Sequence, residues 1–405
     1  MVHDLYWPDG LRIRTVRAMT IVEEQTADLH WTGVERTSRW IVEAEEVAAT
    51  LSTDAAALDE SGAFVDEGFA LLRERGFMSM LVPSELGGGG ATHAEACAVL
   101  ATLARGCPAT SLTLSMHTHL IAAQVWRHHR DLPAPVLAKV ADKQLVLVST
   151  GASDWIESNG TATKTDTGFR VSGRKAPASG APAGDILVTS IRWEDAPDGP
   201  QVIHAAVPFA TEGVSIEETW DTLGMRATGS HTVVLDDVLI PDEAVSLIRP
   251  GNEWHPVWST VVGAAMPLIM SSYVGVAEAA AERAVALATR RATRPDVAPV
   301  VGRMLGRLTS ARDSVRAMID SSRNLRFDNT LEHTATTLSR KSTATAAAID
   351  TVSMALDAGG GAAYARGSGI DRLFRDVQGA RYHPLSTERQ EGFTGRIALG
   401  LDPLD

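Results

Sequence analysis

The spacing of hydrophobic residues changes twice along this 405-residue chain, and that change limits the folds it can adopt. From about Arg36 to Trp126, apolar residues recur at helical spacing, as Val65, Phe69 and Leu72 do. Thr92 stands where it can cap a further helix in this region. The first part of the chain is therefore predicted to be helical.

Short runs rich in Val, Ile and Thr replace the helical spacing between Gln144 and Pro241. Each run is bounded by Gly, Pro or Asp, as strands separated by turns usually are. The runs are LVLVST, GFRVSG, DILVTSI, VIHAAVPF, GVSIEE and HTVVLDDVLIP. They predict a β-barrel or β-sandwich in the middle of the chain.

Helical spacing returns after Pro241 in one apolar stripe that continues over many turns. The stripe consists of Val297, Val301, Met304, Leu308, Ala311, Val315, Met318 and Ile319. It predicts a C-terminal four-helix bundle, and the whole chain is expected to have an α+β fold. The expected parts are a disordered tail at 1–30, a helical domain at 31–142, a β domain at 143–242 and the bundle at 243–405.

Charge and cysteine content exclude several classes of protein. The net charge of -13 disfavours nucleic acid and anionic membranes as partners. Cys97 and Cys107 are the only cysteines, so neither a disulfide framework nor a CxxC metal site can form. Residues 257–277 carry no charge, but Gly and Pro interrupt them, which favours a buried helix over a membrane span. We expect a cytoplasmic protein without a metal site.

Common nucleotide-binding motifs are missing, since no GxGxxG follows a strand and no GxxxxGK[ST] is present. The segment LVPSELGGGG, at Leu81–Gly90, breaks the helical region with a proline and four glycines. It is either a flexible loop or a place where the backbone closely approaches another group. Any nucleotide cofactor has to bind by another arrangement.

Three segments together resemble the acyl-CoA dehydrogenase superfamily, over roughly Glu60 to the C-terminus. They are LGMRATGSHTVVLDDVLIP at Leu223–Pro241, VPSELGGGG, and GFRVSGRK in the β region. The resemblance implies FAD, with its ring between the β domain and the bundle and its adenosine end at a neighbouring subunit. A homotetramer or homodimer is therefore expected, and FMN or diffusible reduced flavin is the alternative to FAD.

The resemblance assigns flavin contacts in the β domain. The segment VSTGASD is similar to the family's flavin-contacting loop and places Ser149 and Thr150 against the ring. Hydroxyls both donate and accept, as the mixed edge of a flavin requires. Ser179 falls where the family has a hydroxyl near flavin N5, while Pro177 replaces the family's usual tryptophan. Hydroxyls that merely end a strand are the alternative interpretation.

A second set of cofactor residues is implied in the bundle. Arg291 matches the family's pyrophosphate-binding arginine, and a guanidinium suits diphosphate oxygens. Gly360 and Gly361, in LDAGGGAAY, match the glycine turn that lets the backbone approach the diphosphate. The aromatic-glycine pair that normally follows the arginine is replaced by ATRPD, and a surface role for Arg291 stays open.

The chain departs from the dehydrogenases at the general base. Such an enzyme needs a carboxylate that removes the α-proton of an acyl thioester. The two family positions for this glutamate hold Pro384 and Ala265, neither of which can take a proton. His383, beside the first position, and Glu391, in EGFTGR, are the remaining candidates, although Glu391 also fits a solvated helix face.

Other features resemble the superfamily's monooxygenase branch, which uses a hydroperoxyflavin on amines, phenols or thiophenes. A histidine-proline segment like His383–Pro384 occurs in that branch. His117 and His119 lie where it places an active-site histidine, with a polar helix face as the alternative. Met266 replaces the arginine that many dehydrogenases have near the CoA end.

Three functions follow from the resemblance. The first is oxidation of an acyl thioester, on CoA or a carrier protein, at its α,β carbons, with electrons passing to an electron-transfer flavoprotein. The second is a flavin monooxygenase that acts on a small molecule beside a flavin reductase, with His383, His119 and Ser179 around the oxygen. The third is a catalytically inactive flavin-binding subunit.

Overall fold

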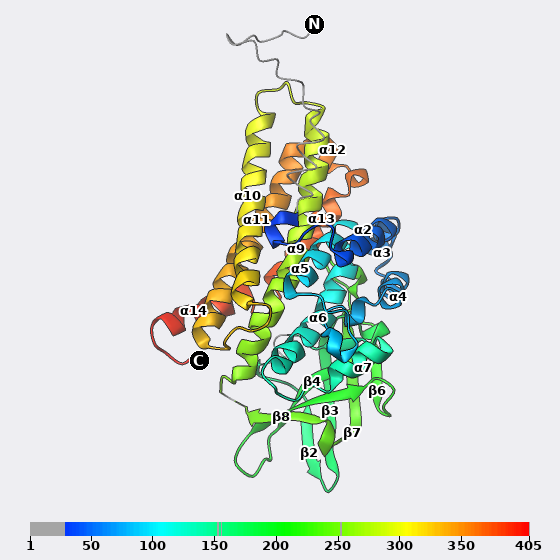
Figure 1. Cartoon of the computed structure of the whole chain (residues 1–405), viewed down its shortest axis with the longest axis vertical. Coiled ribbons are helices and arrows are strands. Elements are labelled where there is room, and N and C mark those ends of the chain that lie inside the picture. The colour runs from blue at the N-terminus through cyan, green and yellow to red at the C-terminus, as the bar shows by residue number, and fades with distance from the viewer. Residues whose placement is uncertain (1–28, 152–153, 155, 252, 405) are drawn as a thin grey trace.

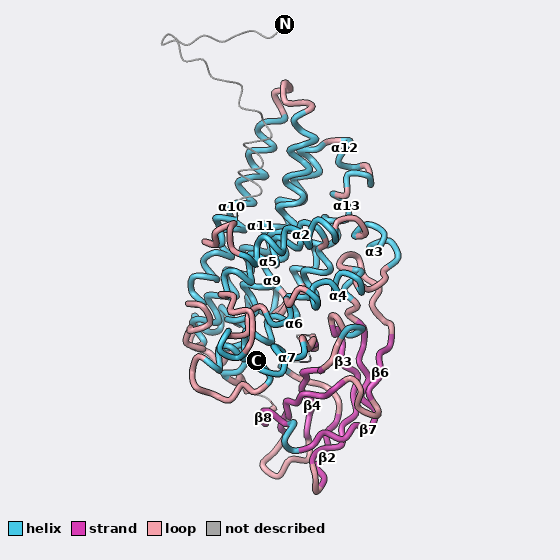
Figure 2. The backbone as a smooth tube through the Cα atoms, turned by 45° about the vertical axis from the view of Figure 1, so that its right-hand side comes forward, coloured by secondary structure: helices cyan, strands magenta, loops and turns pink. Residues whose placement is uncertain are grey.

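A computed structural model describes residues 29–151, 154, 156–251 and 253–404. The tail expected at 1–30 therefore lies outside the described residues, except for its last two. The remaining chain forms a helical N-terminal region, a β region and a helical C-terminal region, as expected (Figure 1). The strands gather at one end of the molecule and the long helices extend away from them (Figure 2).

The N-terminal region packs short helices around two long ones. A capping box begins the first of the long helices: Thr92 accepts from the backbone N–H of Glu95, whose carboxylate accepts from the backbone N–H of Thr92. The predicted cap at Thr92 is thus present. The helices are α2 (Arg39–Leu51), α3 (Ala55–Ser61), α4 (Asp66–Glu74), α5 (His93–Gly106), α6 (Pro108–His128) and α7 (Val136–Lys143), with 3-10 turns at Leu29–Thr32, Phe77–Ser79 and Ser84–Leu86.

The glycine-rich segment is a tightly packed turn. A Cβ on Gly89 would lie 2.3 Å from the Trp40 ring and 2.7 Å from the Met80 carbonyl oxygen. The backbone N–H of Gly89 also donates to the Ser79 carbonyl. Of the two interpretations of this segment, close backbone approach describes the structure, and the group approached is the protein itself.

The middle region contains two four-stranded sheets, with strand orders β1-β4-β5-β8 and β2-β3-β7-β6. Among the strand pairs that the structure describes, β1 with β4 is parallel and the others are antiparallel. The six predicted runs all form strands. β2 was not predicted because it is mostly polar and exposed, and β8 because its one buried residue is Arg249 while Ile248 is exposed. The strands are β1 (Leu147–Ser149), β2 (Thr161–Thr165), β3 (Gly168–Ala178), β4 (Ile186–Trp193), β5 (Gln201–Pro208), β6 (Val214–Glu217), β7 (His231–Pro241) and β8 (Val245–Pro250).

One long helix, α9 (Pro256–Thr289), forms the centre of the molecule. It packs against α5 and α6 on one side and against the two other long helices of the bundle on the other. Among the described residues it is the one helix that is long and apolar enough to cross a membrane. However, 94% of its apolar 18-residue stretch is buried inside the protein. The other C-terminal helices are α10 (Val297–Ser322), α11 (Leu331–Gly359), α12 (Gly361–Tyr364), α13 (Ile370–Val377) and α14 (Thr387–Ala398).

A buried ion pair fastens the segment that follows β1 to the β region. Lys175, on β3, donates to Asp154 Oδ1 at 2.7 Å, and both side chains are inaccessible to solvent. The same ammonium also donates to the backbone carbonyls of Asn159 and Ser190. The pair also helps to position Ser149, the last residue of β1, which lines the cavity described below.

We predict that Asp154→Asn lowers the free energy of unfolding by about 3–5 kcal/mol, because it leaves the Lys175 charge buried without its carboxylate. Urea unfolding of the purified protein measures this. Arg174→Gln is the matched control on the same strand, because it breaks an exposed pair with Glu217 and should cost no more than about 1 kcal/mol. Equal effects of the two variants would contradict the prediction.

Candidate functional site

A cavity of about 650 Å³ lies between the β region, α6, α9 and the segment that joins α13 to α14. Its volume is within the roughly 300–1,000 Å³ of small-molecule and cofactor sites. Most of its wall is apolar. Among the described lining residues the large apolar ones are Leu112, Met116, Ile156, Trp220, Leu223, Met225, Trp254, Trp258, Val261, Val262, Met266, Ile269 and Leu385.

Hydroxyl groups form the β side of the cavity. Ser149, Thr150 and Ser179 all line it, so the structure brings together the three residues that the family resemblance implied for the flavin ring. Thr150 Oγ1 lies 3.3 Å from the hydroxyl of Thr189. No hydrogen-bond partner of Ser149 Oγ is found among the described residues, which leaves this group available to a ligand.

The hydroxyl of Ser179 is one end of a directed chain of hydrogen bonds. Thr228 Oγ1 donates to the Met225 carbonyl at 2.9 Å, so it can only accept from Ser230 Oγ, 2.7 Å away. Ser230 in turn has to accept from Ser179, also at 2.7 Å. The single Ser179 proton is therefore engaged, and a lone pair of its oxygen is left for the cavity.

The two predicted histidines of α6 have different surroundings. His117 bonds the Met78 carbonyl through Nε2 and the Leu147 N–H through Nδ1, so both ring nitrogens join α6 to its neighbours. His119 lines the cavity, and its Nδ1 lies 3.3 Å from the Ser115 carbonyl. Burial lowers the pKa of His119 to about 4, which keeps its ring uncharged at neutral pH.

His383 also lines the cavity, from the segment between α13 and α14. Its Nε2 lies 2.6 Å from the hydroxyl of Tyr273 on α9. Burial lowers the pKa of His383 to about 3, and the charge of Lys341 acts in the same direction. Burial also raises the pKa of Tyr273. At neutral pH the two side chains therefore form an uncharged pair.

Lys341, on α11, holds the backbone around His383. Its ammonium donates to the carbonyls of His383 and Leu385, at 2.9 Å each. Burial lowers the pKa of this fully buried lysine to about 8. The sequence analysis missed both Lys341 and Tyr273. Lys341 could have been noticed because it lies three residues after Leu338, on the helix face that is buried. Tyr273 offered no signal except that it is the one tyrosine in the apolar run 257–277.

The remaining predicted residues lie away from the cavity. Glu391 is exposed on α14 and does not line the cavity. Arg291 donates to the Ala358 carbonyl at 2.6 Å, and its guanidinium lies against Gly360, at the start of α12. Gly361 follows in α12, at the end of the molecule far from the strands (Figure 1). The structure thus brings Arg291 and the glycine turn together, apart from the hydroxyl groups.

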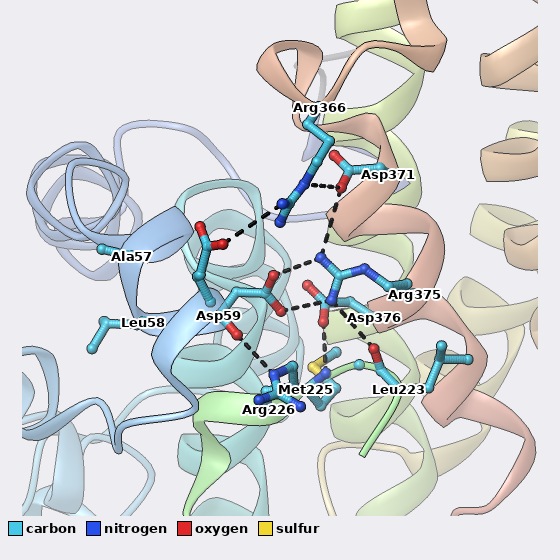
Figure 3. A network of polar contacts seen from close by, with 12 residues as sticks. Ala57, Leu58, Asp59, Leu223, Met225, Arg226, Arg366, Asp371, Arg375 and Asp376 are labelled. Carbon is cyan, nitrogen blue, oxygen red and sulfur yellow. Dashed lines mark hydrogen bonds and ion pairs between the residues drawn. The ribbon is translucent and has the colours of Figure 1, made fainter. Parts of the chain in front are cut away.

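A network of charges joins one wall of the cavity to the bundle (Figure 3). Arg375, on α13, forms a two-pronged pair with Asp59 at 2.6 and 3.0 Å and donates to the Leu223 carbonyl. Asp376, the next residue, accepts from the backbone N–H of Met225 at 2.6 Å. Leu223 and Met225 line the cavity, so α13 positions the turn that carries them.

Three domain models of one family match most of the chain. They are the acyl-CoA dehydrogenase N-terminal domain at residues 42–132, the middle domain at 149–238 and the C-terminal domain at 268–387. The chain belongs to the acyl-CoA dehydrogenase family. The cavity lies where the middle domain of this family meets the two helical ones.

Individual relatives within the family differ in activity. YdbM of Bacillus subtilis, provisionally named as an acyl-CoA dehydrogenase, is 30% identical over 60% of this chain and 64% of its own length. Isobutylamine N-hydroxylase of Streptomyces viridifaciens is 29% identical over 52% of this chain and 58% of its own. The chain spans about three fifths of the length of these curated relatives.

A solved structure is similar over nearly the full length. It is KijD3 in complex with FMN and dTDP-3-amino-2,3,6-trideoxy-4-keto-3-methyl-D-glucose, with a TM-score of 0.80 and 27% identity. The match covers 96% of this chain and 95% of KijD3. The proteins that resemble this chain therefore include one named for an N-hydroxylation and one solved with FMN bound.

The buried carboxyl in the network generates a pH prediction. Burial raises the pKa of Asp376 from 3.8 to about 6, so the folded state holds this proton more tightly than the unfolded state. Stability contributed by the protonated group is therefore lost as the pH rises from about 4 to about 6. Asp376→Asn, whose amide oxygen can still accept from Met225, should be more stable than wild type at pH 7 by up to about 3 kcal/mol.

The measurement is urea unfolding of both proteins between pH 4.5 and 8. The advantage of the variant should grow through pH 6 and shrink toward pH 4.5. Parallel stability curves over this range would show that Asp376 is not the titrating group.

Proposed function

We propose that this chain is a flavin-dependent monooxygenase that transfers one oxygen atom from O₂ to an uncharged small molecule. The proposal rests on the ionisable side chains that line the cavity. Among its described lining residues there is no carboxylate, and two uncharged imidazoles, His119 and His383, stand in place of a general base.

The β side of the cavity supports binding of a flavin ring. Ser149 offers a hydroxyl without a partner among the described residues, and Thr150 and Ser179 lie on the same wall. The hydrogen-bond chain leaves Ser179 as an acceptor, which suits the N–H that a flavin carries at N5 in its reduced form. This donor and acceptor set fits reduced FMN or FAD.

When bound, the reduced flavin supplies two electrons, so that one oxygen atom of O₂ enters the substrate and the other leaves as water. The chain's own residues bind and orient the substrate. Three tryptophans, Trp220, Trp254 and Trp258, offer apolar faces on the cavity wall. Among the described residues of the wall, the cationic side chains are Arg375 and Arg389. Arg375 is paired with Asp59, and Arg389 with Glu157. The wall therefore suits an apolar, uncharged substrate.

Dehydrogenation of an acyl thioester is the second candidate, favoured by the similarity to YdbM. It requires a base that holds a proton taken from carbon. His383, with a pKa near 3, is a poor acceptor, and Glu391 is exposed outside the cavity. The family positions for the base hold Pro384 and Ala265, which line the cavity without an ionisable group.

The relatives support oxygen chemistry. Isobutylamine N-hydroxylase is a similar protein whose name states an oxygenation, and KijD3 has been solved with FMN bound. Electrons would then come from a separate flavin reductase in the cytoplasm. For FAD, the group formed by Arg291, Gly360 and Gly361 would bind the diphosphate of a neighbouring subunit's cofactor in a homotetramer or homodimer.

The proposal is tested by supplying the purified protein with a flavin reductase, FMN, NADH and ¹⁸O₂, together with a panel of neutral aromatic compounds and thioethers. We expect a product with one ¹⁸O atom, detected by mass spectrometry. Anaerobic bleaching of bound oxidised flavin by acyl-CoA, with no labelled product, would favour the dehydrogenase. If neither reaction is detected, the result favours an inactive binding subunit.

Two substitutions sharpen this test. His383→Ala should lower the rate of ¹⁸O incorporation by roughly a hundredfold, because a hydrogen-bonding group of the cavity wall is lost. Glu391→Gln should retain the wild-type rate, since its side chain is exposed outside the cavity. The opposite pattern, with Glu391 required and His383 dispensable, would contradict the assignment.

A further inference from the structure

The buried hydroxyl of Tyr273 has one hydrogen-bond partner among the described residues, the Nε2 atom of His383 at 2.6 Å. Tyr273 is fully buried, and a buried phenol O–H needs an acceptor. If His383 donated instead, the Tyr273 proton would be left without an acceptor in the described structure. The tyrosine therefore donates and Nε2 of His383 accepts.

This direction decides where the single proton of the neutral imidazole lies. Because Nε2 accepts, Nδ1 of His383 carries the hydrogen. No partner of Nδ1 is found among the described residues, and it is not among the buried polar atoms that lack one, so it has access to the cavity. His383 therefore presents an N–H donor to a ligand.

His119 has the same tautomer but presents the other ring nitrogen to the cavity. Its Nδ1 faces the carbonyl of Ser115, which can only accept, so Nδ1 is the protonated nitrogen. The Nε2 atom has no partner among the described residues and keeps its lone pair, on a side chain that lines the same cavity. Both rings line the same cavity, and a charge on His119 would lower the pKa of His383.

We propose that Tyr273 acts as a positioning residue that fixes the tautomer of His383, so that His383 and His119 form a matched donor and acceptor pair in the cavity. Such a pair recognises one group that both accepts and donates a hydrogen bond. The substrate class is then an apolar molecule with a hydroxyl or an uncharged amine, because no described carboxylate of the wall would pair with an ammonium.

The charged groups around the pair favour these neutral forms. Lys341, on α11, holds the backbone of His383 and its charge opposes protonation of the ring. Asp376, on α13, acts on Tyr273 and opposes loss of its proton. These charges thus keep both side chains neutral, and the hydrogen bond from Tyr273 to Nε2 then fixes the tautomer of His383.

The first test is direct and uses flavin-free wild-type protein with ¹⁵N-labelled histidine. Nitrogen NMR distinguishes the two tautomers of an imidazole, and His383→Asn identifies the signals of His383 by their loss. We expect a protonated Nδ1 and a bare Nε2 in His383, and the same protonated atom in His119. A protonated Nε2 in His383 would overturn the proposal.

Tyr273→Phe removes only the hydroxyl that sets the tautomer. In this variant the His383 signals should shift toward the form protonated at Nε2, while Tyr364→Phe, an exposed tyrosine on α12, should leave them unchanged. Unaltered His383 signals in a folded Tyr273→Phe protein would also overturn the proposal. The wild-type spectrum decides the question even if this variant fails to fold.

A binding comparison tests the recognition itself. Phenol both donates and accepts, whereas anisole can only accept, so calorimetry with flavin-free protein should show phenol binding roughly fivefold more tightly. Tyr273→Phe should weaken the binding of both compounds, because each accepts its hydrogen bond from Nδ1 of His383. Anisole binding as tightly as phenol would contradict the matched pair.

The substrate class rests on the proposed monooxygenase function, but the tautomers and the preference for phenol are measured without flavin or oxygen. A correct tautomer without ¹⁸O incorporation would overturn only the function. The wrong tautomer with incorporation would overturn only the role of Tyr273.

Discussion

The rest of the structure depends on the close crossing of α9 and α5. A Cβ on Gly275 would lie 2.2 Å from the Ala101 carbonyl oxygen, so a larger residue would push the two helices apart. α9 also packs against α6, α10 and α11, and its first half lines the cavity. Tyr273, two residues before Gly275, is placed by this crossing, and so is the ring of His383 that it contacts.

The buried charge of Lys341, which is bonded to carbonyl oxygens, helps to keep the His383 side chain in the cavity neutral. Lys341 is buried and hydrogen-bonded to carbonyl oxygens, so its charge acts on the ring of His383. The imidazole stays neutral, and a neutral ring has one donor and one acceptor whose order is set by its partner. A carboxylate in the same place would have made a base, as dehydrogenation requires. The structure instead supports hydrogen bonding to an uncharged substrate.

Much of the fold and part of the site could be predicted from local sequence. Periodicity alone separated the helical regions from the β region, because helices and strands repeat every 3.6 and 2 residues. The resemblance of VSTGASD and GFRVSGRK to segments of the family then implied Ser149, Thr150 and Ser179, which share one wall of the cavity. The missing carboxylate at Pro384 was also visible, since no structure is needed to see that proline cannot take a proton.

Tertiary structure alone decided which distant residues meet. Glu391 was a candidate because EGFTGR resembles the family's glutamate-glycine pair, and α14 turns it outward. His117 and His119 both matched the histidine position of the monooxygenase branch, and the structure shows that both ring nitrogens of His117 bond neighbouring backbone. The contact between Tyr273 and His383 joins residues 110 apart and has no periodic signal. The sequence by itself therefore determined the class of fold and the loss of the base. Packing determined the polar pair that replaced it, because hydrogen-bond direction depends on partners that only folding brings together.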